Sequence, residues 1–247
     1  MRAKFGTIGG TVASGAALAA TGFLVARPWF LRWGATDAEI SRTWPGDEMS
    51  PDPASAATRA ITIHAPVEVV WPWIVQIGQD RGGFYSYTWL ENLVGARMRN
   101  ADRIIPGLTL EEGDTVWMAP KERFGGKGCS KVARLDPSRA LVMVSPEDYG
   151  AVRETGVAPK GTWAILLDPV DDHTTRLVVR SRSGPREGLV RFLAFDPVHF
   201  IMERKMMLGI RDRAEAEAAR RPALQVPDVD EYVAGAARCG RPGWGSA

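Results

Sequence analysis

The order of hydrophobic periodicities between residues 59 and 221 constrains the fold of this chain more than any other feature. Residues 59–64 alternate in polarity with period two, which predicts a half-buried strand. Pro66 follows in the first-turn position that a helix tolerates, and residues 67–77 carry Val70, Trp73 and Ile77 at helical spacing. The folded unit is therefore expected to open with a strand followed by a helix.

A series of strands separated by turn residues follows this opening. After a short helix expected at residues 88–93, the strand candidates are residues 115–119, 130–135, 141–144, 162–167 and 176–183. A long helix is predicted from Val198 to about Arg220, with Asp196 as its cap and Pro197 at its start. This order predicts an α+β fold in which a curved antiparallel sheet wraps around the long C-terminal helix.

Composition limits the classes of function. The 247 residues are 45% hydrophobic and 24% charged, which is typical of a globular protein. A net charge of +2 leaves no basic excess for binding nucleic acid, so no nucleic-acid partner is expected. Two cysteines and three histidines provide neither a disulfide framework nor a metal-ligand spacing. We therefore expect no metal and no cofactor.

The first 35 residues are predicted to form a membrane anchor. Residues 5–26 carry no charge, and a helix of this length spans about the thickness of the hydrocarbon layer. Trp29 and Trp33 near Arg27 are typical of the interfacial end of a single-pass span that is retained. Small residues on both sides of Leu18 also fit a signal-peptide cleavage site, so secretion after cleavage is the alternative. Basic residues on both sides leave the orientation open.

Three further segments complete the predicted organisation. Residues 36–58 contain three prolines and several small residues, which predicts a linker without helix or strand. Residues 59–221 form the single folded domain, and residues 222–247 form a C-terminal tail. The chain is thus interpreted as one domain that a Pro-rich linker holds off a membrane.

Two stretches resemble the START-like or SRPBCC superfamily, which includes polyketide cyclase/dehydrase-like and lipid-transport proteins. Residues 60–73 (AITIHAPVEVVWPW) are similar to its opening strand and helix. Residues 200–211 (FIMERKMMLGIR) are similar to the closing helix of a bacterial branch with an N-terminal hydrophobic segment. The resemblance implies a helix-grip fold with a cavity between the bent sheet and the terminal helix. It says little about chemistry, because the superfamily includes both carriers and enzymes.

Candidate ligand-binding residues are those that could face such a cavity. Met202, Met206 and Met207 form a soft surface on the terminal helix, which can adapt to ligands of different shape. Gly209 on the same side is expected to leave space that another side chain would fill. The candidates are Trp73, Tyr85, Tyr87, Trp89, Trp117, Trp163, Met202, Met206 and Ile210. For each of them, the alternative is that it only fills the core.

Two residues of the terminal helix are candidates for proton transfer. Glu203 lies near the apolar arc, where burial would suit it to acid–base chemistry. The alternative is a carboxylate at the helix edge, paired with Arg204, Lys205 or Arg211. His199 lies in the first predicted turn, where it could exchange protons at neutral pH or simply remain on the surface.

A basic stripe follows the last predicted strand, because Arg176, Arg180 and Arg182 alternate with apolar or small residues. The stripe is interpreted as a solvated outer face, and recognition of an anionic head group inside the cavity is the alternative.

These observations leave two hypotheses for function. The first is a membrane-tethered module that binds a hydrophobic small molecule, such as a lipid, a polyketide or an isoprenoid. The second is an enzyme of the cyclase or dehydratase kind, in which Glu203 and His199 transfer protons within the same cavity. The absence of a convergent polar motif in the sequence favours the binding module.

Overall fold

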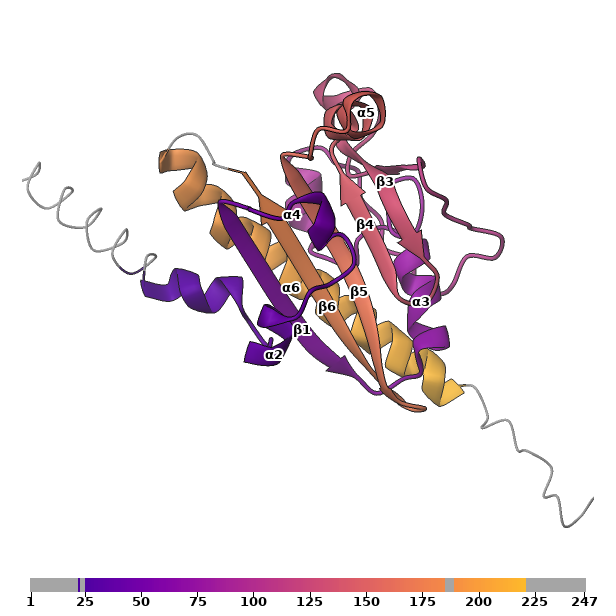
Figure 1. Ribbon diagram of the computed structural model, residues 1–247. Helices are drawn as coiled ribbons and strands as arrows, with labels where there is room; N and C mark the ends of the chain where they lie inside the picture. The colour runs from indigo at the N-terminus through magenta and orange to yellow at the C-terminus, as the bar shows by residue number, and fades with distance from the viewer. Residues whose placement is uncertain (1–21, 23–24, 185–188, 221–247) are drawn as a thin grey trace, which may run out of the picture.

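The computed structural model describes residues 22, 25–184 and 189–220, with the side chains of residues 124 and 189–195 excepted. Its centre is a six-stranded antiparallel sheet of strand order β1-β6-β5-β4-β3-β2 (Figure 1). The strands are β1 (Ser55–Ile63), β2 (Thr115–Trp117), β3 (Cys129–Asp136), β4 (Ala140–Val144), β5 (Gly161–Asp171) and β6 (Thr174–Ser183). Each strand predicted from the sequence is present.

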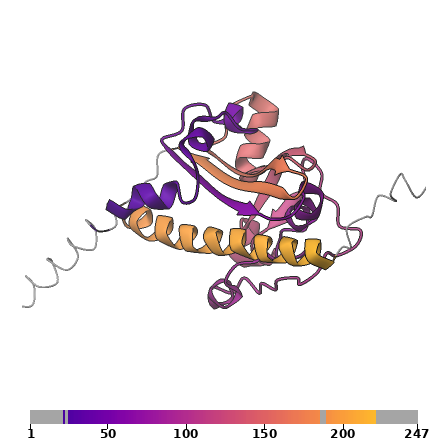
Figure 2. The ribbon, with the colours of Figure 1, turned by 90° about the horizontal axis from the view of Figure 1, so that it is seen from below.

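The long helix α6 (Leu189–Arg220) lies along one face of this sheet, which we call the inner face (Figure 2). Helix α3 (Val67–Val75) packs against both α6 and the sheet, and the short helix α4 (Thr88–Leu93) follows it in the chain. The α+β prediction is therefore confirmed, and the arrangement agrees with the helix-grip fold that the resemblance implies.

The main core fills the space between the inner face and the helices. Strand residues such as Ile63, Ile165 and Leu177 pack there against Trp73 of α3 and Met207 of α6, and all are buried. Burial of apolar area on this scale is the main source of stability in a domain of this size. The core thus fixes α6 across the sheet.

The outer face of the sheet is covered by residues that precede β1, which corrects the prediction of a linker there. Residues 36–58 were expected to lack helix and strand, but they include α2 (Asp37–Ser41), the 3-10 helix η1 (Asp47–Met49) and the start of β1. Trp44 is buried there in a second apolar cluster with Ala60, Val142 and Leu166 of the sheet. Local prolines did not prevent this, because tertiary contacts outweigh weak local preferences.

The basic stripe of β6 holds this outer segment in place. Arg180 is buried and donates hydrogen bonds to Asp47 (2.8 Å) and to the Thr58 hydroxyl (2.6 Å). Arg176 forms an ion pair with Glu39 of α2 at 2.8 Å. Burial alone would raise the pKa of the Glu39 carboxyl. Hydrogen bonds from Arg176 and from the Thr36 backbone together outweigh burial, so this pKa lies below its usual value. The stripe therefore lies on the outer face as predicted, but it is ion-paired rather than solvated.

Helix α6 begins earlier than the sequence predicts. It starts at Leu189, and Pro197 lies inside it rather than in its first turn. Asp196 does not cap a helix, because its carboxylate is buried and forms an ion pair with Arg27 at 3.0 Å. Phe30 stacks on Phe200 in the same region, with 5.0 Å between the ring centres. Contacts with residues 25–33 thus stabilise a part of α6 in which proline removes one helical hydrogen bond.

One helix was not predicted, although its sequence carries the signals. In α5 (Pro146–Thr155), the Ser145 hydroxyl caps the start by accepting a hydrogen bond from the Asp148 amide, and Pro146 occupies the first turn. Gly156 ends the helix in the left-handed conformation. The helix lies beyond the end of the sheet (Figure 1), and most of its residues are half-buried or exposed.

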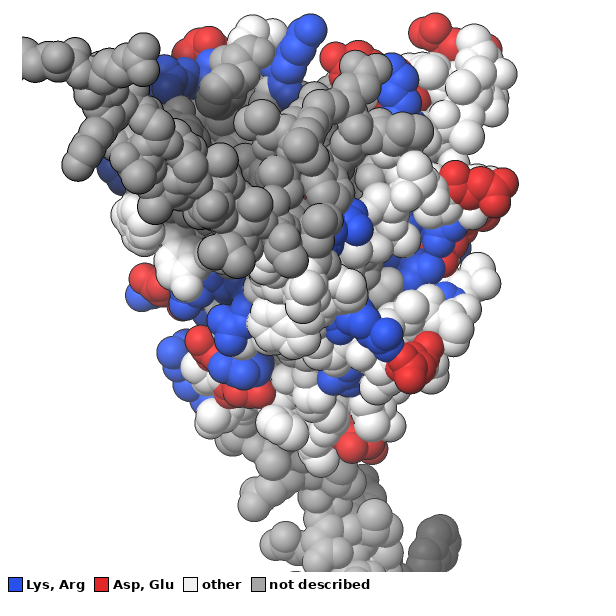
Figure 3. Space-filling view, turned by 90° about the vertical axis from the view of Figure 1, so that its left-hand side faces the viewer, with Lys and Arg blue, Asp and Glu red and all other residues white. Residues whose placement is uncertain are grey.

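Most of the predicted membrane anchor lies outside the described residues, as does the predicted C-terminal tail at 222–247. Residues 25–31 are helical and contact α6. Among the helices that the structure describes, none is both long enough and apolar enough to cross a membrane. On the face shown in Figure 3, basic and acidic side chains are interspersed, in line with the small net charge.

Candidate functional site

A cavity of about 310 Å³ lies between the inner face of the sheet, the segment around α4, and α6. Its residues come from the loop before α4, α4 and the loop after it, the segment after β2, strand β5, and α6. They are Phe84, Ser86, Glu91, Val94, Ala96, Met98, Met118, Ala119, Gly128, Trp163, His199, Met202, Glu203 and Met206. Most of these side chains are apolar, which is typical of a site for a small organic ligand.

Two aromatic residues form one wall of the cavity. The rings of Phe84 and Trp163 stack with 6.1 Å between their centres and an interplanar angle of 27°. The Trp163 indole nitrogen donates a hydrogen bond of 2.9 Å to Oε1 of Glu203. Since the indole is held at both its face and its nitrogen, this wall has a fixed orientation.

Glu203 lies in a buried ion pair that the sequence analysis did not identify. Its other oxygen, Oε2, accepts a hydrogen bond from Arg59 of β1, and both side chains are buried. Arg59 also donates to the Phe30 carbonyl oxygen at 2.7 Å and lies over the Phe200 ring at 5.4 Å. Glu203 is thus buried rather than at the helix edge, and its partner is Arg59 rather than a neighbour on the same helix.

The basic neighbours of Glu203 on α6 point elsewhere. The Arg204 guanidinium lies 4.9 Å from the Trp33 ring centre, and the Lys205 ammonium lies 5.9 Å from that of Tyr87. Arg211 forms its ion pair with Asp212 at 2.8 Å. Two-point binding by Arg59 and Trp163 therefore positions the Glu203 carboxylate and links α6 to β1 and β5.

Glu91 is the cavity residue with the most unusual environment. Its Oε2 atom is buried and has no hydrogen-bond partner among the described residues. Burial raises the pKa of the Glu91 carboxyl to about 7, because the ionised carboxylate loses its hydration there. Sequence reasoning missed it, because a glutamate in a six-residue helix resembles any exposed one.

The structure brings together five of the predicted site residues at this cavity. They are Glu203, His199, Trp163, Met202 and Met206. His199 does not lie in the first turn of α6, because the helix begins ten residues earlier at Leu189. Its position one turn before Glu203 places both residues on the cavity side of the helix.

The other six predicted residues lie elsewhere. Trp73, Tyr85 and Ile210 are fully buried in the main core. Tyr87 and Trp89 pack edge to face at the start of α4, where Trp89 is exposed. Trp117 of β2 lies beside Lys121, with 5.3 Å between the ammonium and the ring centre. The three core residues therefore fill the core, which was the alternative to a ligand-binding role.

The prediction that Gly209 leaves empty space is wrong, because Tyr85 packs against it. A Cβ atom at this position would overlap the Tyr85 carbonyl oxygen and lie 2.8 Å from Tyr85 Cβ. The glycine therefore allows the backbone of Tyr85 to pack directly against α6. The Tyr85 hydroxyl donates to the Trp73 carbonyl at 3.0 Å, and burial raises its pKa. This contact fixes the loop that leads into α4 and the cavity.

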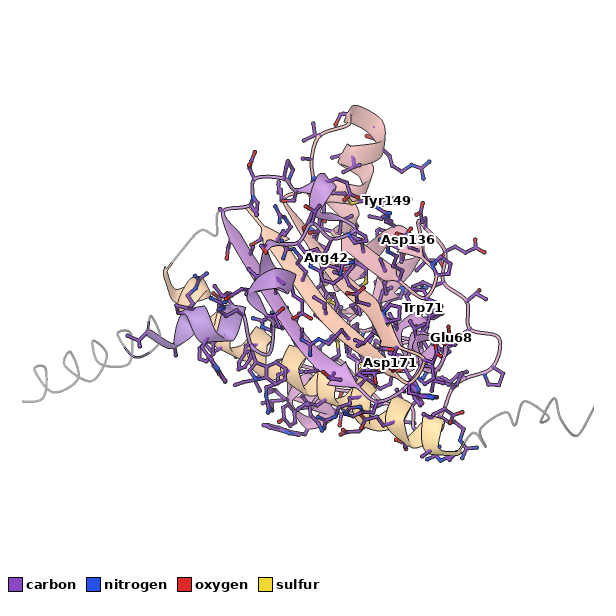
Figure 4. The ribbon with its side chains drawn as sticks, turned by 60° about the horizontal axis from the view of Figure 1, so that its bottom comes forward. Arg42, Glu68, Trp71, Asp136, Tyr149 and Asp171 are labelled. Atoms are coloured by element: carbon purple, nitrogen blue, oxygen red, sulfur yellow. The ribbon has the colours of Figure 1, made fainter. Side chains whose placement is uncertain are left out.

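A second cavity of about 320 Å³ lies beside α3, next to the loop before β2 and the end of β3. It is lined by Trp71, Pro72, Val75, Gln76, Ile104, Ile105, Leu108, Thr109, Leu110, Leu135 and Pro137. Figure 4 shows Trp71 of α3 on the same side of the molecule as Asp136 at the end of β3. The Gln76 side chain, a polar group at this cavity, already has a hydrogen-bond partner within the protein, because its oxygen accepts from the Ile105 amide at 2.9 Å. We therefore treat the first cavity as the candidate site.

Among the described residues, no group of three or more His, Cys, Asp or Glu side chains is arranged to hold a metal ion. Cys129 is a free thiol in β3, and burial raises its pKa. The thiol is therefore less reactive than an exposed one.

Comparison with known proteins gives distant structural likenesses. No protein-family model and no curated protein matches the sequence. A protein from Nitrosospira multiformis is 15% identical over 67% of this chain and all of its own, with a TM-score of 0.39. The self-sacrificing resistance protein CalC from Micromonospora echinospora is 11% identical over 67% of this chain and 97% of its own, with a TM-score of 0.40.

The Aha1 dimer from Colwellia psychrerythraea gives a third likeness, at 17% identity over 66% of this chain and 98% of its own, with a TM-score of 0.37. At TM-scores below 0.5, these likenesses carry no argument about function. The description of the fold therefore rests on the strand order and on the position of α6, and any function must be argued from the cavity.

Proposed function

We propose that this protein binds a hydrophobic small molecule, such as a lipid, a polyketide or an isoprenoid, in the cavity between the sheet, α4 and α6. The observation that carries the proposal is the apolar cavity of about 310 Å³, which is large enough for a small organic ligand. Met202 and Met206 line it and can adapt their shape to a guest. Trp163 and Phe84 add a flat aromatic wall.

The cavity supports binding better than acid–base catalysis by Glu203. Both oxygens of this carboxylate already accept hydrogen bonds, from Arg59 and from Trp163. A catalytic acid or base needs a free site within hydrogen-bond reach of the reacting atom. We therefore assign Glu203 a positioning role, and the proposal does not extend to a cyclase or dehydratase reaction.

The cavity-filling variant Ala119→Phe tests the binding proposal. Ala119 is buried and lines the cavity, so a phenyl ring there would occupy the space of a ligand. We expect binding of the neutral fluorescent probe N-phenyl-1-naphthylamine to weaken at least tenfold, which corresponds to about 1.4 kcal/mol. Fluorescence titration of the full chain measures this.

The matched control is Thr109→Phe, which would fill the second cavity instead. We expect this variant to bind the probe like the unmodified protein. Both variants retain residues 5–26, so any probe that this apolar segment takes up appears equally in both titrations. Loss of binding in Thr109→Phe with retention in Ala119→Phe would move the site to the second cavity, and the proposal would be wrong.

We also propose that residues 5–26 tether this domain to a membrane. The uncharged stretch in the sequence supports this, together with the attachment of the residues that follow it. Arg27 pairs with Asp196, and Phe30 stacks on Phe200, so the chain joins α6 directly after the apolar stretch. Trp29, Val198 and Ile201 are exposed near this junction, where apolar side chains would meet lipid. In this proposal the domain lies against the membrane rather than at the end of a flexible linker.

Flotation with phosphatidylcholine vesicles tests the tether. The double variant Ala16→Asp, Leu18→Asp places two charges in the middle of the apolar stretch, each unfavourable by about 2.5–3.5 kcal/mol at the centre of a span. We expect the full chain to float with the vesicles and this variant to stay in the soluble fraction. The control Val157→Asp, Val170→Asp alters two exposed residues of the domain and should float. Equal flotation of all three proteins contradicts the tether.

A further inference from the structure

We infer that the surface around the opening of this cavity binds an anionic phospholipid bilayer. The inference rests on the proposed function, because it places against lipid the opening through which a hydrophobic ligand would enter. It goes beyond the proposed tether, because it concerns side chains on and after α4 and after β2 rather than residues 5–26.

The cavity opens where two of its apolar lining residues are exposed. Val94 directly follows α4, and Met118 directly follows β2. Leu93 and Trp89 continue this apolar surface along α4, since residues four apart lie on the same side of a helix and both are exposed. We call these four residues the mouth surface. Exposed apolar side chains that gather around a cavity opening indicate an interaction surface.

Basic side chains flank the mouth surface. Four exposed ones lie on the segments after α4 and after β2, both of which line the cavity, and they are Arg97, Lys121, Arg123 and Lys127. Arg123 donates a hydrogen bond of 2.8 Å to the Val94 carbonyl oxygen. Glu122 offsets part of this charge through its contact with Arg97 at 3.4 Å. Basic residues beside exposed apolar ones, including a tryptophan, match a bilayer with anionic head groups.

The apolar stretch of the sequence joins the domain close to this opening. Residues 5–26 are followed by Arg27, which pairs with Asp196 of α6 at 3.0 Å. Asp196 lies about one helical turn before His199, which lines the cavity. In Figure 2, α4 lies below α6 and farther from the sheet than α6 does. A bilayer that holds residues 5–26 is therefore within reach of the mouth surface.

A fluorescent label on the mouth surface tests the inference. Both cysteines of the full chain are replaced by serine, and the variant Leu93→Cys is labelled with the polarity-sensitive dye NBD. With vesicles of equal parts phosphatidylcholine and phosphatidylserine, we expect the NBD emission to shift to the blue and to be quenched by nitroxide-labelled lipid. The control Val170→Cys carries the dye on an exposed residue near the end of β5 and should show neither change. Both proteins retain residues 5–26, so the tether contributes equally.

The basic side chains are tested without the tether. Ala16→Asp, Leu18→Asp is combined with the labelled Leu93→Cys, and Lys121→Gln, Lys127→Gln then removes two charges beside the mouth surface. Each lysine near an anionic bilayer contributes about fivefold to binding, so the lipid concentration that gives half of the blue shift should rise about 25-fold. The control Arg139→Gln, Arg220→Gln removes the same charge from the turn after β3 and from the end of α6, and should have little effect.

The possible outcomes separate this inference from the proposed function. If N-phenyl-1-naphthylamine does not bind the unmodified protein, both are wrong. If that probe binds but Leu93→Cys shows no blue shift with vesicles, or the same shift as Val170→Cys, the inference alone is wrong. An unchanged response in Lys121→Gln, Lys127→Gln also overturns it, because the bilayer is then not recognised by its charge. A blue shift that appears without vesicles and grows with protein concentration means that the mouth surface binds a second copy of the chain instead.

Discussion

The variant Arg59→Met should lower the free energy of unfolding by about 3–5 kcal/mol, the range measured when one partner of a buried ion pair is removed. The side chains of Arg59 and Glu203 are only 3% and 2% exposed. Methionine keeps much of the volume of arginine, so the main change is the loss of the positive charge beside the Glu203 carboxylate. Denaturation in urea, with comparison of midpoints at equal slope, measures the difference.

The exposed pair of Arg97 and Glu122 provides the control. Its side chains are 74% and 69% exposed, and such pairs contribute about 0–1 kcal/mol, so Arg97→Met should have little effect. The double variant Arg59→Met, Glu203→Leu should recover most of the loss, because no unpaired charge remains. A loss in Arg59→Met no larger than in Arg97→Met would show that the pair is not buried as described.

The variant Gly209→Ala should destabilise the protein by about 1–3 kcal/mol, the usual range for overpacking a core. Its new methyl group would overlap the carbonyl oxygen of Tyr85. A backbone oxygen cannot move aside by a side-chain rotation, so either the loop or α6 must shift. Helix propensity alone predicts the opposite sign, a gain of about 0.8–1 kcal/mol on replacing glycine by alanine. Thermal and urea denaturation distinguish the two signs.

Gly150 in the middle of α5 is the matched control. A Cβ atom at this position would have no neighbour within 4 Å, so Gly150→Ala should show the propensity gain alone. A stabilising effect in both variants would mean that Tyr85 does not pack against α6 at Gly209.

Local patterns were sufficient for the parts of the fold with clear periodicity. The helix expected at residues 88–93 has the same bounds in the structure, and β1 differs mainly by beginning earlier, at Ser55. Local patterns failed where contacts between residues far apart in the sequence decide the conformation. Residues 36–50 belong to the predicted Pro-rich linker, yet they pack on the outer face because the buried Arg180 of β6 requires a counter-charge, which Asp47 provides.

The candidate site was only partly predictable for a similar reason. Helical spacing placed Met202, Met206 and Glu203 on the side of α6 that lines the cavity. The inward position of Arg59 could have been predicted from the sequence. Arg59 alternates in phase with Ile61 and Ile63, so it must face inwards with them. A buried arginine on the first strand requires a buried carboxylate, and Glu203 fulfils that requirement. No comparable pattern identifies Glu91, whose environment depends on how α4 folds over the sheet.

The contacts of Arg59 have one more consequence, for the rigidity of the cavity wall. Hydrogen bonds run from the Phe30 carbonyl through Arg59 and Glu203 to the Trp163 indole. A ligand that displaces the Trp163 indole must therefore distort these connected hydrogen bonds, which end at Phe30 in the segment before β1. The mobility of the Trp163 side chain is thus set partly by residues that do not line the cavity, such as Arg59 and Phe30. Greater mobility of the backbone at Phe30 would therefore make the aromatic wall of the cavity more mobile as well.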